Sequence, residues 1–268
     1  MEQSSLSDGN ATSPTADTSV MALFGVNFLV SRPHRFGLVF WGAAEAEPQV
    51  AKDYLHEVLL AEANREAFFD LIEKEGLVVC KNIQAEASSY RRVKGKSSAG
   101  RLSQAEYYHH DGCSGPAKPR IDEIRLPHTA LDRSVATAVA PFEDVVRAQF
   151  EALPERLLAD SSIVEGRVLF AEGGDRPPVE LWDQIQGRTT RLVRRELDAE
   201  SARAYFREVD RLAGAYDLPW EAGESRLMLN DHPDLTQTMQ HRRAYQKPRV
   251  MNEANGSLVK RWTAEELA

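Results

Sequence analysis

The chain has 268 residues, of which 42% are hydrophobic and 28% are charged, and its formal net charge is −8. This composition is typical of a globular protein with enough apolar material for a core. The acidic balance argues against nucleic acid and membrane partners, because both call for clustered Lys and Arg. We therefore expect a small-molecule substrate, while the oligomeric state stays open.

Residues 1–19 carry almost no large apolar side chains and many small polar ones. Such a segment cannot repay the entropy of ordering, so we expect a disordered tail. Residues 20–268 have the length and composition of one elaborated domain. We therefore predict a single domain after the tail.

The cellular compartment is suggested by what the sequence lacks. The N-terminal residues have no apolar stretch of the signal-peptide kind. The longest apolar runs, Met21–Val30 and Phe36–Ala44, fall short of the roughly 20 residues that a membrane-spanning helix needs. Cys80 and Cys113 have no metal-ligand spacing, which fits a reducing compartment. We expect a cytoplasmic protein.

The first elements are predicted from apolar runs and turn residues. Met21–Trp41 indicates two short strands separated by the turn Ser31–His34. Gln49–Glu75 has the three- and four-residue periodicity of a helix. Gly76 then ends the helix as a C-cap, and Leu77–Cys80 follows as a buried strand.

The later elements alternate strands and helices. Ile121–Leu126 has the alternation of a strand, and Arg133–Leu157 predicts a small-residue strand followed by a helix. Asp198–Tyr216 predicts a helix capped by Asp198. The turn Asn255-Gly256 favours a hairpin whose returning strand is Leu258–Trp262. Residues 159–190 carry no clear pattern.

A metal-binding pattern lies between these elements, at His109-His110-Asp111. Side chains alternate faces in an extended segment, so His109 and Asp111 point the same way and can reach one ion. A second histidine from elsewhere would complete a two-histidine, one-carboxylate set, which suits iron(II) and leaves positions open. His241 and His232 are the two candidates, and His110 would face away from the metal in a supporting role.

Four segments carry a family resemblance: the helix and strand Phe68–Ile83, the strand and helix Arg133–Leu157, the Trp220–Asp231 strand, and Gln240–Tyr245, which contains a His-x-Arg motif. They resemble segments of the TauD and clavaminate-synthase-like iron(II)/2-oxoglutarate-dependent oxygenases. The order Asn230-Asp231 departs from the Asp-Asn of the family. The resemblance favours His241 as the distal ligand.

The resemblance implies a fold that is mainly β with flanking helices (α+β), built on a double-stranded β-helix of the jelly-roll, cupin-like kind. Within it, residues 159–190 would supply barrel strands and an insertion over the site. The implied cofactors are Fe(II), 2-oxoglutarate as co-substrate and O2. The implied reaction is hydroxylation, desaturation or cyclisation at an unactivated C–H bond of a small, carboxylate-bearing substrate.

The same resemblance suggests further site residues. Arg261 or, second to it, Arg249 would bind the distal carboxylate of 2-oxoglutarate, since arginine offers a bidentate donor pair. Ser134 would assist in binding the co-substrate. Tyr108 and Arg243 would contact the substrate. No catalytic residue is expected beyond the metal ligands.

Two functions of other classes remain open at this point. The same histidines and aspartate could hold zinc in a metal-dependent hydrolase. The chain could also be a non-catalytic jelly-roll binding module. A His110-Asp111 dyad of the helical phosphohydrolases is disfavoured, because Gly112, Pro116 and Pro119 prevent a helix there.

Overall fold

The computed structural model describes most of the chain after the predicted tail. Residues 1–16 lie outside it, so the tail and the single-domain organisation stay predictions. The described ranges are 17–44, 54–83, 91–92, 108–111, 119–126, 135–171, 179–219, 223–234, 237–245 and 258–263.

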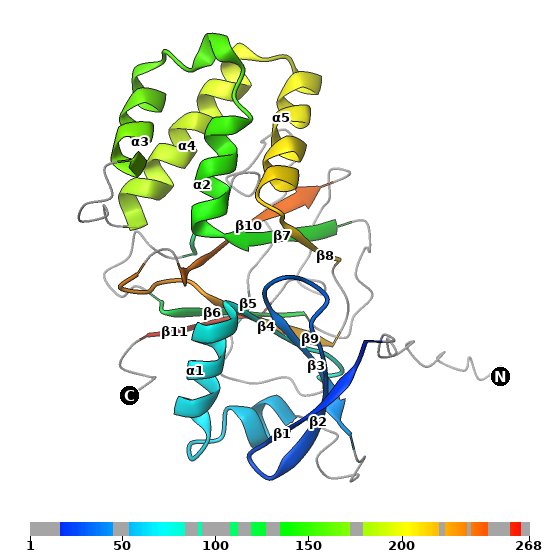
Figure 1. Ribbon diagram of the computed structural model, residues 1–268. Helices are drawn as coiled ribbons and strands as arrows, with labels where there is room; N and C mark the ends of the chain where they lie inside the picture. The colour runs from blue at the N-terminus through cyan, green and yellow to red at the C-terminus, as the bar shows by residue number, and fades with distance from the viewer. Residues whose placement is uncertain are drawn as a thin grey trace, which may run out of the picture.

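Two sheets form the centre of the molecule (Figure 1). The larger sheet has the strand order β1-β2-β3-β4-β9-β6-β11-β5, and the smaller has the order β10-β7-β8. The strands of the larger sheet are β1 (Ser19–Leu23), β2 (Val26–Ser31), β3 (Leu38–Ala43), β4 (Leu77–Cys80), β5 (Arg91–Arg92), β6 (Ile121–Leu126), β9 (Glu224–Leu229) and β11 (Leu258–Trp262). The smaller sheet contains β7 (Val135–Pro141), β8 (Tyr216–Pro219) and β10 (Met239–Tyr245).

The two sheets face each other across an apolar layer. Its buried residues from the larger sheet are Val39, Leu77, Val79 and Met228, and those from the smaller sheet are Val139, Leu218 and Met239. Helix α1 (Arg65–Glu75) covers the other face of the larger sheet through Phe68, Phe69 and Ile72. The fold is therefore a mixed α+β structure dominated by sheets with flanking helices, which agrees with the predicted class.

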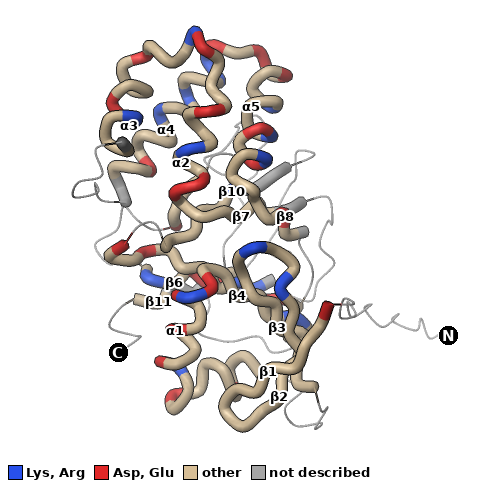
Figure 2. The backbone as a smooth tube through the Cα atoms, in the orientation of Figure 1, with Lys and Arg blue, Asp and Glu red and all other residues tan. Residues whose placement is uncertain are grey.

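Helices α2–α5 cover the smaller sheet on its outer side (Figure 1). All of them are inserted between the paired strands β7 and β8. Their bounds are α2 (Phe142–Glu151), α3 (Ser161–Ala171), α4 (Val179–Glu196) and α5 (Ala199–Leu212). Acidic and basic residues are interspersed along these helices (Figure 2). None of the helices in the described ranges is both long and apolar enough to cross a membrane.

The helices correct one expectation and confirm another. In the described parts of residues 159–190 the chain is helical, as α3 and the first part of α4, so the expectation of barrel strands there was wrong. Asp198 caps α5 as predicted, accepting hydrogen bonds at 2.9 Å from the backbone N–H groups of Glu200 and Ser201. The cap was readable because its partners lie within one helical turn.

The first of the two predicted N-terminal strands, Met21–Val30, is a hairpin of two strands rather than a single strand. Strands β1 and β2 are antiparallel and are joined by Phe24 and Gly25, which both have positive φ values of 52° and 76°. A two-residue turn with two positive φ angles is the tight hairpin turn that matches strand twist. The prediction missed it because phenylalanine rarely takes this conformation.

The predicted helix Gln49–Glu75 is interrupted. The described part begins with a π-helical turn at Leu55–Leu59, and α1 starts only at Arg65. The Asn64 side chain donates to the carbonyl of Val58 at 2.8 Å across the break. The end of α1 agrees with the prediction, since Gly76 has a φ of 71° and its N–H bonds to the Ile72 carbonyl.

Strand β11 has the predicted bounds, and its partners come from distant parts of the chain. It has the bounds Leu258–Trp262, but it pairs antiparallel with β6 and β5 in the larger sheet, not with β10. A local turn signal favours the preceding strand as the partner, whereas here β11 fills the position beside β6. The turn residues Asn255-Gly256 lie outside the described residues.

Tyr205 of α5 makes alkaline stability a test of this packing. Its side chain is buried and its hydroxyl donates to the Gln149 carbonyl at 3.3 Å. Burial raises the pKa of Tyr205 above its ordinary value. The folded state thus loses stability as pH rises past the unfolded value of about 10, because only the unfolded chain ionises readily there. We expect the stability difference between wild type and Tyr205→Phe to shrink between pH 9 and 11 in urea unfolding. A constant difference would contradict it.

Candidate metal centre

His109 and His241 are brought together by main-chain pairing. They form an antiparallel bridge in which His109 N–H bonds to the His241 carbonyl at 3.1 Å and His241 N–H to the His109 carbonyl at 3.3 Å. Residues directly opposite in such a pair place their side chains on the same face. Accordingly, the two imidazole ring centroids lie 4.7 Å apart. The histidine that lies beside His109 is thus His241, on β10.

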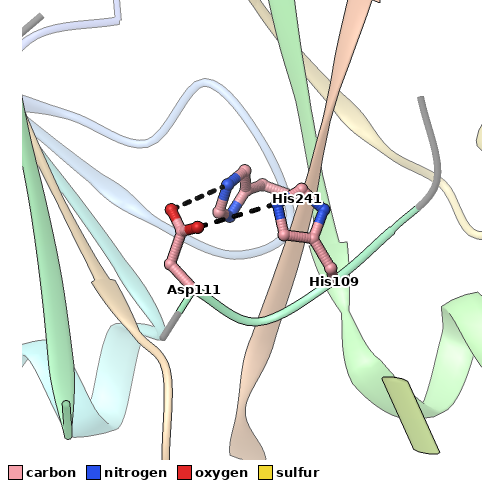
Figure 3. A group of neighbouring side chains, drawn as sticks. All are labelled: His109, Asp111 and His241. Atoms are coloured by element: carbon pink, nitrogen blue, oxygen red, sulfur yellow. Dashed lines mark ion pairs between the residues drawn. The ribbon is translucent and has the colours of Figure 1, made fainter. Parts of the chain in front are cut away.

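Asp111 joins the two histidines on that face (Figure 3). Its carboxylate lies 3.7 Å from Nε2 of His109 and 3.4 Å from Nε2 of His241. One ligand atom from each of the three residues lies within 4.8 Å of the other two. The alternation of the extended segment explains the arrangement, since Asp111 is two residues after His109.

The three side chains fit a single divalent metal ion. Ligands about 2.1 Å from an ion and at a right angle to each other lie about 3 Å apart, so small adjustments bring these donors into coordination. The carboxylate and the two imidazoles have the composition of the iron(II) facial triad. The side chains of His109 and Asp111 are 20% and 28% exposed, whereas that of His241 is 6% exposed. The site is therefore held from the buried β10 side and reachable from the other.

The opposite face of the same segment is bound to the helices. His110 is 3% exposed and contacts Asp183 of α4 through Nδ1 at 3.3 Å and Thr238 through Nε2 at 3.0 Å. Gln240, beside His241, lies 3.2 Å from His110 Nδ1 and exchanges two 2.7 Å hydrogen bonds with Gln186 of α4. His110 thus faces away from His109 and Asp111, as the H-x-D pattern predicts, and contacts Asp183 and Thr238 instead.

A second buried network on this face contains Tyr108. Its hydroxyl donates to Asp210 of α5 at 2.8 Å, and Arg242 binds the same carboxylate through Nε at 2.7 Å and through Nη2. Burial raises the pKa of Tyr108 well above its ordinary value, so the phenol stays a neutral donor. Tyr108 therefore packs towards the helices, and its role as a substrate contact remains a prediction that these contacts do not favour.

Of the other predicted site residues, the structure gives the backbone position of some and does not describe the rest. Arg243 lies on β10, and Arg261 lies on β11 with its backbone in register with Asp122 of β6. Ser134 and Arg249 lie outside the described residues. His232, the competing histidine, lies in the loop after β9, where its Nδ1 accepts from the Asp234 N–H at 3.0 Å.

Two groups of buried polar residues escaped the sequence prediction. Asn230 contacts the backbone of Asp111 directly. Lys81, Glu224 and Arg226 form a buried ion network, with Lys81 Nζ 2.6 Å from Glu224 and Arg226 Nε 2.6 Å from the same carboxylate. The only signal for Asn230 was its position in the reversed Asn-Asp pair. The alternation Glu224-Ser225-Arg226 is typical of a strand with one polar face, whereas every residue of β9 is buried.

Comparisons with known proteins yield structural similarity at low sequence identity. No protein-family model matches the chain, and no curated protein matches it. Two solved structures of PvcB, one from Pseudomonas aeruginosa and one described as an Fe, alpha-ketoglutarate dependent oxygenase from an isonitrile synthetic pathway, are 14% identical, with 96% of each chain covered and a TM-score of 0.48. AAD-2 in complex with Mn(II) and N-oxalylglycine is 11% identical, covering 87% of this chain and 97% of that chain, with a TM-score of 0.41. A taurine dioxygenase from Burkholderia xenovorans is 10% identical, covering 91% and 89%, with a TM-score of 0.41.

Proposed function

We propose that the chain is an iron(II)/2-oxoglutarate-dependent oxygenase that acts at an unactivated C–H bond of a small, carboxylate-bearing substrate. The observation that carries this proposal is the cluster of His109, Asp111 and His241 on one face of two bridged segments. A two-histidine, one-carboxylate set leaves several positions of a metal ion free. This suits a co-substrate and O2 better than a closed structural site.

The side chains have distinct tasks in this proposal. His109, Asp111 and His241 would hold the metal ion, and the carboxylate would offset part of its charge. When bound, iron(II) and 2-oxoglutarate would supply the activation of O2, which protein side chains cannot perform. The apolar layer between the sheets, with Val139, Met228 and Met239, would exclude water beside the site.

The double-stranded β-helix belongs to the same proposal. Strands far apart in sequence are neighbours in both sheets, as in the pairs β6–β9 and β7–β10. Such interleaved pairing is characteristic of jelly-roll folds, in which the two sheets enclose a central site. The facing sheets of this chain support that architecture.

The proposed contacts with the co-substrate and the substrate follow from the resemblance to the oxygenase family. Arg261, on the strand beside β6, is proposed to bind the distal carboxylate of 2-oxoglutarate, with Arg249 as the second candidate and Ser134 as a further contact. Arg243 is proposed to meet the carboxylate of the substrate. Asp111 occupies the position that halogenases of the family leave to a small residue, so hydroxylation, desaturation or cyclisation is the proposed outcome.

The proposal is tested by oxygen consumption and succinate formation. Protein purified without metal should consume O2 and release succinate only when both iron(II) and 2-oxoglutarate are supplied, at a slow basal rate even without substrate. Adding candidate amino acids and other small carboxylates should then accelerate the reaction. Iron binding without any 2-oxoglutarate binding would contradict the proposal, and zinc-dependent hydrolysis would favour the metal-dependent hydrolase instead.

A further inference from the structure

The Asn230 side chain is fully engaged with main-chain groups around Asp111. Its Oδ1 accepts from the Asp111 N–H at 2.8 Å, and its Nδ2 donates to the carbonyls of Asp111 and Pro119, each at 2.9 Å. An asparagine amide has two donor hydrogens and one acceptor oxygen, so each group of this amide is used. The residue is 2% exposed, which makes these hydrogen bonds costly to lose.

Main-chain hydrogen bonds at the end of β9 hold Asn230 itself in place. It directly follows β9, and its N–H bonds to the Arg120 carbonyl at 2.8 Å. The preceding residue, Leu229, pairs with Ile121 of β6 and donates its N–H to the Gly76 carbonyl at 2.9 Å. The amide thus projects from the end of β9, which lies between β4 and β6 in the larger sheet.

The amide imitates a neighbouring strand. It exchanges both an N–H and a C=O bond with Asp111, as one residue of an antiparallel pair does with its partner. On the other side, His109 is bridged to His241 of β10. The short segment from His109 to Asp111 carries two of the three predicted ligands. It is attached to the smaller sheet at His109 and to the larger sheet at Asp111.

We propose that Asn230 is a positioning residue for the metal site, which fixes the backbone of Asp111 so that its carboxylate faces His109 and His241. This inference rests on the proposed metal-dependent function. Metal sites need their ligands held within about 0.5 Å of the productive geometry, and the partners that hold ligands contribute about 10- to 100-fold in metal affinity. Asp111 lies in no described strand, so the amide of Asn230 replaces the ladder that would otherwise hold it.

The chemistry of the contact makes an amide necessary. In Asn230→Asp one acceptor remains, but both donors are lost and a carboxylate meets the carbonyls of Asp111 and Pro119. In Asn230→Ala all three hydrogen bonds are lost. We expect each variant to bind Mn(II) or Co(II) about 10- to 100-fold more weakly than wild type.

The experiment is a titration of metal-free protein with Mn(II) and Co(II), monitored by isothermal calorimetry. Asn64→Ala is the matched control, because the Asn64 amide donates to the Val58 carbonyl at 2.8 Å beside α1, away from the metal site. It should bind the metal as wild type does. In an Asp111→Ala background, adding Asn230→Ala should cause no further loss, since Asn230 acts through Asp111. Circular dichroism and thermal unfolding of the metal-free variants monitor the fold.

The outcomes separate this inference from the proposed function. If wild type binds no divalent metal, the proposed function fails. If wild type binds and Asp111→Ala binds weakly, but Asn230→Ala and Asn230→Asp bind like wild type, then the positioning role is overturned. It is also overturned if both variants fail to fold, or if Asn230→Ala weakens binding equally with and without Asp111, because either result assigns Asn230 to general stability.

Discussion

Asp111→Ala and His241→Ala are each expected to abolish iron-dependent O2 consumption while the chain remains folded. Each change removes one of three ligand groups. Changes to the residues that merely hold ligands already cost about 10- to 100-fold in metal affinity, so we expect iron affinity to fall by more than about 100-fold. The fold should survive because β10 is held to β7 by main-chain pairing, which the His241 side chain does not provide. Calorimetric iron(II) titration measures the iron affinity, succinate release measures the turnover, and circular dichroism monitors the fold.

His232→Ala is the matched control for this result. The His232 imidazole accepts a hydrogen bond within its own loop, from the Asp234 N–H, and is not part of the metal cluster. Its replacement should leave iron affinity and succinate release unchanged. The assignment of the distal ligand is wrong if His241→Ala retains activity and His232→Ala loses it. Iron binding that survives removal of Asp111 and His241 together would place the metal elsewhere.

Asp210→Ala should be among the most destabilising single substitutions in the molecule. Arg242 is 7% exposed and binds both carboxylate oxygens of Asp210 on α5, and Tyr108 donates to the same carboxylate. Burial lowers the pKa of Arg242, but hydrogen bonds and the charge of Asp210 more than offset this, so the guanidinium stays charged. Removing one partner of a buried pair leaves an uncompensated charge and costs about 3–5 kcal/mol. Urea unfolding at neutral pH measures the loss.

Glu208→Ala provides the control on the same helix. Glu208 pairs with Arg211 at 2.6 Å, but both side chains are exposed, with relative exposures of 42% and 68%. Exposed pairs are weakened by solvent and contribute little. The variant should therefore unfold at the same urea concentration as wild type. Equal effects of Asp210→Ala and Glu208→Ala would mean that the Arg242 network does not stabilise the fold.

Local features of the fold were readable because their causes lie within a few residues. The Asp198 cap bonds to N–H groups two and three residues later, and Gly76 ends α1 through a positive φ that glycine tolerates. Strand β6 was recognised from its alternation. The hairpin turn at Phe24-Gly25 escaped prediction because Phe24 adopts a conformation against its own preference, which the neighbouring strands impose.

The candidate metal centre also has one part that the local sequence predicts and another that it does not. The H-x-D spacing already determined that His109 and Asp111 share one face and that His110 faces away, because this follows from the period of an extended chain. The same period explains why Tyr108 and His110 meet Arg242 and Gln240 on the back of the segment. Those partners, however, became apparent only once the register of the bridge was known.

By itself, the sequence determined the elements with clear local signals, such as β6, the end of α1 and the start of α5, and one half of the candidate metal centre, since each depends on contacts within a turn or two of chain. Only the tertiary structure decided that His241, not His232, lies opposite His109, that β11 joins β6, and that Asn230 holds Asp111. Which distant strands pair depends on the burial of both faces of the sheets and on the satisfaction of every buried backbone group. These conditions involve the whole fold, so no local pattern could specify them.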